Sequence, residues 1–185
     1  MRLRFSFARV GILISVGAVL FTCGCHQAAK QAPAAAASIE DAPQIGAVTP
    51  NSGTGRSQAF RLVVTHPAGA TAIADVQLLI DEKMTPTAAK SCWIDVNSLN
   101  RVAARTEDGS DWLPFVPIGS AKAASNEQCS VDASSVKVET NGPELAVTLL
   151  VTFAHAFKGE KKVWVVASGP RKHSGWQERG AWMVE

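Results

Sequence analysis

The sequence predicts an all-β protein, an antiparallel β-sandwich of about seven to nine short strands. From residue 44 onward, apolar side chains alternate with polar ones in one short run after another, which is the period of an extended strand. Gly, Pro, Asn and Asp separate these runs, and these residues are typical of turns. No segment keeps a helical period over ten residues, and residues 154–159 allow one helical turn at most.

The strongest run covers residues 144–153, ELAVTLLVTF, and we expect the other strands to pack against it. At about 3.3 Å per residue it spans roughly 30 Å, close to the height of a small sandwich. The side chains predicted to face the core are Leu145, Val147, Leu149, Val151 and Phe153.

Five weaker strands are expected before this central run. Alternation places them at residues 45–48, 60–65, 75–80, 92–96 and 101–105. The turn formers of residues 49–55 end the first of them, and His66-Pro67 ends the second.

The remaining strands are marked by turn signals. Asp108-Gly109 predicts a hairpin that leads into a strand at residues 112–116. A strand at 136–139 is joined to the central run by the turn formers Asn141-Gly142. Strands at 163–167 and 176–184 follow the central run and complete the domain.

The first 24 residues predict a bacterial lipoprotein signal peptide. Arg2, Arg4 and Arg9 precede an apolar run at residues 10–21, which is too short to span a bilayer of about 30 Å. The end of this segment resembles the lipobox of bacterial lipoproteins, because the small residue Gly24 precedes Cys25. Cys23 competes for the same role, but it follows the bulkier Thr22.

We therefore expect cleavage before Cys25 and lipidation of Cys25, with ordinary secretion as the alternative. Residues 25–43 then form the lipid anchor and a flexible linker rich in Ala, Gln and Pro, and residues 44–185 form the domain. The resemblance implies a cell-envelope location. His26 follows the lipidated residue where inner-membrane retention in this class uses Asp, so the outer membrane is favoured.

The charge balance argues against nucleic-acid binding. The chain has 18 basic and 16 acidic residues, and three of the basic ones lie in the signal peptide, which leaves 15 after cleavage. A nearly neutral domain lacks the basic surface that phosphate backbones require.

Cys92 and Cys129 predict a structural disulfide. They are the two cysteines outside the N-terminal segment, and an exported protein enters an oxidising compartment. The alternatives are two buried thiols or half of a metal site. No C-x-x-C motif or histidine cluster accompanies either cysteine, so we predict no metal and no cofactor.

Several segments together resemble an immunoglobulin-like domain that recurs in bacterial surface and secreted proteins. They are the opening 48–53, the strand with Cys92, the Asp108-Gly109 hairpin with Trp112, the second cysteine Cys129, and the ending 174–184, SGWQERGAWMV. The resemblance covers about residues 44–185 and implies an Ig-like or fibronectin-III-like sandwich in an extracytoplasmic setting, with no catalytic residue. The loop 168–173 is basic where related modules carry an Asp- and Asn-containing turn, so no calcium role is implied there.

The tryptophans supply the candidate binding residues. The chain has five Trp and no Tyr. Trp93, Trp112 and Trp176 would form a platform for stacking on sugar rings if they meet on one surface. The alternative is that they pack the core and cover loops. A basic group at 158–162 and 171–173 is interpreted as a solvated strand edge.

These observations favour a non-enzymatic envelope lipoprotein whose Ig-like module acts in adhesion, assembly or protein-protein interaction. Its partners would be the membrane, through the anchor, and an envelope protein or glycan. A carbohydrate-binding module is the alternative, and an enzyme or enzyme inhibitor is the third. No Ser-His, Cys-His or G-x-S-x-G arrangement points to catalysis.

Intact mass spectrometry of protein purified from membranes tests the anchor. We expect a chain that begins at Cys25 and carries a diacyl or triacyl group, and a Cys25→Ser variant that lacks this mass. An unlipidated chain would instead indicate free secretion.

Overall fold

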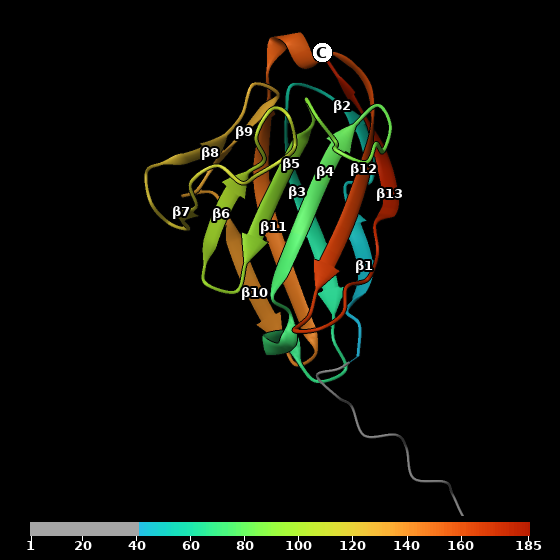
Figure 1. Ribbon diagram of the computed structural model, residues 1–185, viewed down its shortest axis with the longest axis vertical. Coiled ribbons are helices and arrows are strands. Elements are labelled where there is room, and N and C mark those ends of the chain that lie inside the picture. The colour runs from blue at the N-terminus through green and yellow to red at the C-terminus, as the bar shows by residue number, and fades with distance from the viewer. Residues whose placement is uncertain (1–40) are drawn as a thin grey trace, which may run out of the picture. The chain divides into compact units, whose positions relative to one another are not determined.

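The computed structural model describes residues 41–185, which fold into two packed β-sheets (Figure 1). The predicted signal peptide, the lipidation site Cys25 and the linker up to residue 40 lie outside the described residues. Sheet A contains, in spatial order, β1 (Gln44–Thr49), β3 (Ser57–Thr65), β11 (Glu144–Phe153), β9 (Cys129–Asp132) and β8 (Ala123–Ser125), and β10 (Lys137–Asn141) also pairs with β11.

Sheet B contains seven strands. In spatial order they are β2 (Ser52–Thr54), β13 (Gln177–Val184), β12 (Gly159–Ser168), β4 (Asp75–Asp81), β5 (Cys92–Asn97), β6 (Arg101–Ala104) and β7 (Val116–Pro117). Two 3-10 turns complete the elements, η1 (Ala70–Ala72) and η2 (His155–Phe157). The all-β, sandwich-like architecture is thus as predicted, and η2 is the single helical turn allowed at residues 154–159.

The central strand β11 has the predicted role in sheet A. It pairs antiparallel with β3 from Glu144 to Thr152, and its other edge pairs with β10 and then with β9. Its inward side chains are buried at Val147, Leu149, Val151 and Phe153, and Leu145 is partly buried against the same core. Each fully buried side chain of this size stabilises the fold by about 1.5–3 kcal/mol.

Three short strands were not predicted, β2, β8 and β9. The turn formers 52–54 form β2, which pairs parallel with β13, and Trp182 packs beneath it. A side-chain carbon on Gly53 would lie 2.3 Å from the Trp182 ring, so glycine is required there. The Trp182 indole N–H also donates to the Gly55 carbonyl at 2.9 Å.

The expected strand at residues 112–116 is wrong over most of its length. Trp112 forms only an isolated bridge with Arg105, and regular pairing resumes at β7. Pro114 interrupts this segment, and proline cannot donate a ladder hydrogen bond.

The disulfide between Cys92 and Cys129 is confirmed. It joins β5 of sheet B to β9 of sheet A, with 5.4 Å between the two Cα atoms. Both residues are buried in the core, so the bridge connects the inner faces of the two sheets.

The interpretation of the basic group as a solvated edge is wrong for β12. This strand is internal, because it pairs with both β13 and β4. Lys161 is buried, donates to Glu82 at 3.0 Å, and its ammonium lies 4.4 Å from the centre of the Phe157 ring. Lys162 pairs with Glu178 at 2.9 Å.

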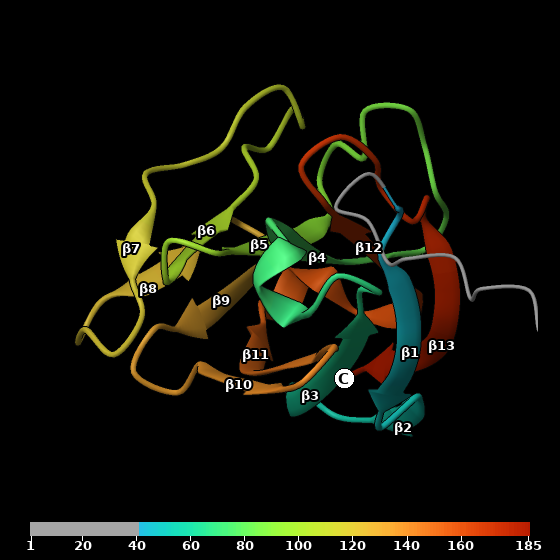
Figure 2. The same cartoon turned by 90° about the horizontal axis from the view of Figure 1, so that it is seen from below.

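Hydrogen bonds connect the start of the described chain to both sheets. The buried His66 ring accepts the Ala68 N–H at Nδ1, so its Nε2 carries the proton and donates to the Asp41 carbonyl at 2.9 Å. Arg179 of β13 donates to the Ile45 carbonyl of β1 at 2.8 Å. Figure 2 shows β1 and β13 side by side where the two sheets meet.

Among residues 41–185, no helix has the length and apolar character needed to cross a membrane.

Removing the disulfide tests its contribution to stability. It closes a loop with a sequence separation of 37, so we expect Cys92→Ala/Cys129→Ala to lower the free energy of unfolding by about 4 kcal/mol in urea titrations. Reduced wild-type protein is the matched control and should show a similar loss. A double variant as stable as the oxidised protein would contradict this account.

Candidate binding surface

The candidate surface lies on the outer face of sheet B. Side chains alternate along β5, so Cys92 points into the core and Trp93 points outward. Strand register sets Trp93 opposite Leu79 of β4, and Leu79 opposite Trp164 of β12. Leu79 and Trp164 are buried although they lie outside the inter-sheet core. The outer face of sheet B therefore has an apolar row of its own.

Four partly exposed rings in contact with one another form what we call the aromatic strip, and two of them, Trp93 and Trp176, pack against Leu79 and Trp164. The strip consists of Trp176, Trp93, Trp112 and Phe115. Successive ring centres are 5.5, 5.6 and 6.2 Å apart. The structure thus gathers the three tryptophans selected from the sequence on one surface. Trp164 lies in the buried cluster against which Trp93 and Trp176 pack.

Arg105 lies over the strip. Its guanidinium carbon is 4.8 Å from the centres of both the Trp93 and the Trp112 rings, within the range of a cation–π interaction. Arg105 also donates to the Gly109 and Ser110 carbonyls. The turn at Asp108-Gly109 therefore fixes the guanidinium in place. Gly109 has φ +71, and a side chain there would collide with the Thr87 carbonyl.

Sequence reasoning missed Arg105 and Phe115 as members of this surface. Phe115 was assigned to a regular strand, and Arg105 to the end of another. The backbone bond from Arg105 N to the Trp93 carbonyl sets these two residues opposite each other. That register between neighbouring strands is the signal that identifies Arg105.

The tryptophan rings do not form a flat platform. The planes of Trp93 and Trp112 meet at 75°, and those of Trp93 and Trp176 at 73°. Such edge-to-face contacts stabilise the cluster itself. Because Arg105 lies over Trp93 and Trp112, the surface offers a mixture of ring edges and a guanidinium.

A shallow apolar cleft of about 400 Å³ adjoins the strip. It lies between the strip and the loop that connects β4 to β5. The residues that line it are Leu79, Met84, Thr85, Pro86, Ala88, Trp93 and Trp176. The Ser91 hydroxyl donates to the Ala88 carbonyl at 2.6 Å and holds this loop in place.

A network of side-chain hydrogen bonds lies beside the strip and contacts Trp93. The Trp93 indole N–H donates to Gln77 Oε1 at 3.0 Å, and Gln77 Nε2 donates to Asp75 Oδ1 at 3.1 Å. Ser168 donates to the same Asp75 oxygen at 3.1 Å. The indole of Trp93 is thereby held in one orientation.

Asp95 lies next to this network and is only 4% exposed. It faces Gln77 across the β4–β5 pair, and its Oδ1 has no hydrogen-bond partner among the described residues. Burial, and then the nearby charge of Asp75, raises the pKa of Asp95 from 3.8 to about 7.

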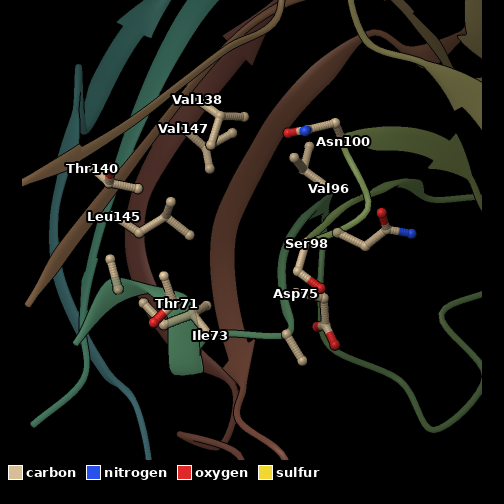
Figure 3. Close-up of a pocket in the computed structure, with 13 residues that line it drawn as sticks. Thr71, Ile73, Asp75, Val96, Ser98, Asn100, Val138, Thr140, Leu145 and Val147 are labelled. Carbon is tan, nitrogen blue, oxygen red and sulfur yellow. The ribbon is translucent and has the colours of Figure 1, made fainter. Parts of the chain in front are cut away.

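A second cavity, of about 240 Å³, lies between the two sheets at the end that carries η1. Figure 3 shows Val138, Thr140, Leu145 and Val147 from sheet A facing Val96, Ser98 and Asn100 from the β5–β6 side. Its lining is mostly apolar, with polar groups from the β5–β6 turn.

Two histidines of the described residues lie on the surface. His155 and His173 are both exposed, and His173 Nδ1 accepts the Gly175 N–H at 3.0 Å. Within residues 41–185, no three His, Cys, Asp or Glu side chains are grouped so that they could hold a metal ion.

A scan against protein-family models found no match, and a search of curated proteins found no significant relative.

The pH dependence of stability tests the environment of Asp95. Native Asp95 keeps its proton up to about pH 7, whereas the unfolded chain loses it near pH 4. The native state therefore binds more protons between these values, and the free energy of unfolding falls as the pH rises through this window. The full difference is roughly 4 kcal/mol.

We expect Asp95→Asn to flatten the decline in the free energy of unfolding, measured by urea titration, between about pH 4 and pH 7. Asp132→Asn is the matched control, because hydrogen bonds from Ser134 lower the pKa of that exposed carboxyl and it titrates below this window. An unchanged slope in Asp95→Asn would show that another group causes the decline.

Proposed function

We propose that this chain is a non-enzymatic cell-envelope lipoprotein whose Ig-like module binds a protein partner through the aromatic strip. Cys25 carries the lipid, and residues 26–43 connect it to the domain. The observation that carries the proposal is the strip together with Arg105, since three tryptophans, a phenylalanine and a guanidinium share one partly exposed surface. Aromatic residues and arginine are enriched where proteins bind one another.

Strand order supports an Ig-like module. The order β1-β3-β11-β9 corresponds to strands A, B, E and D of that fold, and β13-β12-β4 corresponds to G, F and C. Strands β5 and β6 extend the second sheet as C′ and C″ do in variable-type domains. The disulfide departs from the pattern, because it connects the C′ and D positions in place of B and F.

The arrangement of the rings favours a protein over a glycan. A sugar ring stacks on an open aromatic face, whereas Arg105 lies over both Trp93 and Trp112. The adjoining cleft is apolar and is bordered by the exposed Met84, which suits a side chain from a protein partner. The strip and the cleft together form a site for an apolar side chain of the partner, with the Arg105 guanidinium beside it.

A carbohydrate-binding module remains the second candidate. The observation that favours it is Trp176, which lines the cleft without a guanidinium over it in the described contacts. Trp176 would then stack on a sugar while the cleft receives the rest of a glycan chain.

Site-specific photo-crosslinking in native membranes tests the proposal. A photoreactive residue at Met84 should give one discrete protein adduct, and Trp112→Ala should reduce it at least about tenfold, as expected for the loss of an interface anchor. Met183 is the control position, because it is similarly exposed, 42% against 37%, and does not line the cleft.

Calorimetric titration with soluble envelope glycans separates the two candidates. Saturable glycan binding that Trp176→Ala abolishes would support the carbohydrate module in place of the protein partner. Equal adducts at Met84 and Met183, or adducts insensitive to Trp112→Ala, would contradict the proposed surface.

A further inference from the structure

Strand β10 leaves one edge of sheet A open. Among the described residues it pairs only with β11, and all five of its residues are exposed. It lies at the border of sheet A in Figure 1. An open edge of this kind presents backbone groups to which another strand can pair.

The register determines which backbone groups face the open edge. The hairpin pairs Asn141 with Glu144 across a two-residue loop. In such a pair, the backbone N–H of each residue donates to the carbonyl of the other. Bonding alternates along an antiparallel strand, and every second residue turns its N–H and C=O to the opposite edge. Val138 and Thr140 therefore offer their N–H and C=O groups to an incoming strand.

The same two residues line the inter-sheet cavity. Figure 3 shows the side chains of Val138 and Thr140 beside those of Val147 and Leu145, on the sheet A side of the cavity. Val138 is 37% exposed although it is apolar. A strand added at this edge would cover Val138 in addition to satisfying the backbone groups.

We propose that a second copy of this chain is the strand that pairs there, with β10 antiparallel to β10 about a two-fold axis at Val138. In this register, Val138 of one copy lies opposite Val138 of the other, and both residues direct their N–H and C=O groups toward the partner strand. It also sets Lys137 of each copy opposite Glu139 of the other, which gives two complementary charge pairs.

Neighbouring registers lack this complementarity. An axis at Glu139 would set the Glu139 carboxylates of the two copies directly opposite each other, where they repel. An axis at Thr140 would pair Glu139 with the neutral Asn141. The sequence Lys137-Val138-Glu139 is thus complementary to itself in one antiparallel register.

Each copy contributes one short strand, so the dimer should be weak, with Kd on the order of 100 µM. Sedimentation equilibrium of the full chain tests it. We expect Lys137→Glu and Glu139→Lys each to weaken the dimer about tenfold, because each opposes like charges at both symmetric positions. The double variant exchanges the two charges and should restore wild-type affinity.

Two results would overturn the proposal. One is a wild-type protein that stays monomeric up to about 1 mM. The other is a double variant that dimerises as weakly as the single variants. In the proposed register, residue 137 of one copy lies opposite residue 139 of the other, so exchanging the two charges must restore the affinity. Circular dichroism of each variant establishes that the fold is intact.

Oxidative cross-linking tests the register independently. Two Val138 Cα atoms would be about 5.5 Å apart, within reach of a disulfide, whereas two Thr140 residues would be displaced by four positions, roughly 13 Å. Val138→Cys should therefore cross-link and Thr140→Cys should not, with the parent protein oxidised in parallel as background. Equal cross-linking of the two variants would refute the axis at Val138.

Discussion

Burial on both faces of sheet B is the constraint on which the rest of the structure depends. Along β12, Val163 and Val165 point into the inter-sheet core, while Trp164 points to the other side. An outer face with this apolar content must be covered, because exposing it to water is unfavourable. No helix covers it among the described residues, and the cover comes from loops that bring Trp176 and Ala88 over Leu79. The aromatic strip is the outer layer of this cover.

The strip therefore combines two requirements. Leu79 and Trp164, which lie beneath the strip, are buried and stabilise the sheet, whereas the rings of the strip itself stay partly exposed. Arg105, which lies over Trp93 and Trp112, and the hydrogen bond from Trp93 to Gln77 fix the geometry of these exposed rings. A surface whose aromatic groups are already ordered loses little conformational entropy when a partner binds.

Alternation in the sequence was enough to predict the strands that are longest and most buried. It predicted β11 and the inward direction of Val147, Leu149, Val151 and Phe153. It did not predict β2, because Ser52, Gly53 and Thr54 have no apolar period and are held by pairing with β13. Strands of this kind depend on contacts far away in the chain, which a local pattern does not contain.

The candidate surface was predictable only in part, for a related reason. The three tryptophans stand out by composition, but their meeting depends on the register of β5 with β6 and on the loop before β13. Asp95 gives no sequence signal at all, since it occupies an ordinary outward position in an alternating strand. Burial of this carboxyl lowers stability at neutral pH, and titratable groups perturbed in this way cluster at functional sites.

The fastening of the N-terminal end has a mechanical consequence. Tension applied to the chain ahead of Asp41 first reaches the His66 ring at the end of β3, and then reaches β13 through the bond from Arg179 to Ile45. Load is thus divided between the two sheets at the point of entry. The Cys92–Cys129 bridge couples the sheets again deeper in the core. A pull at this end therefore acts on contacts with both sheets, and not on the pairing of β1 with β3 alone.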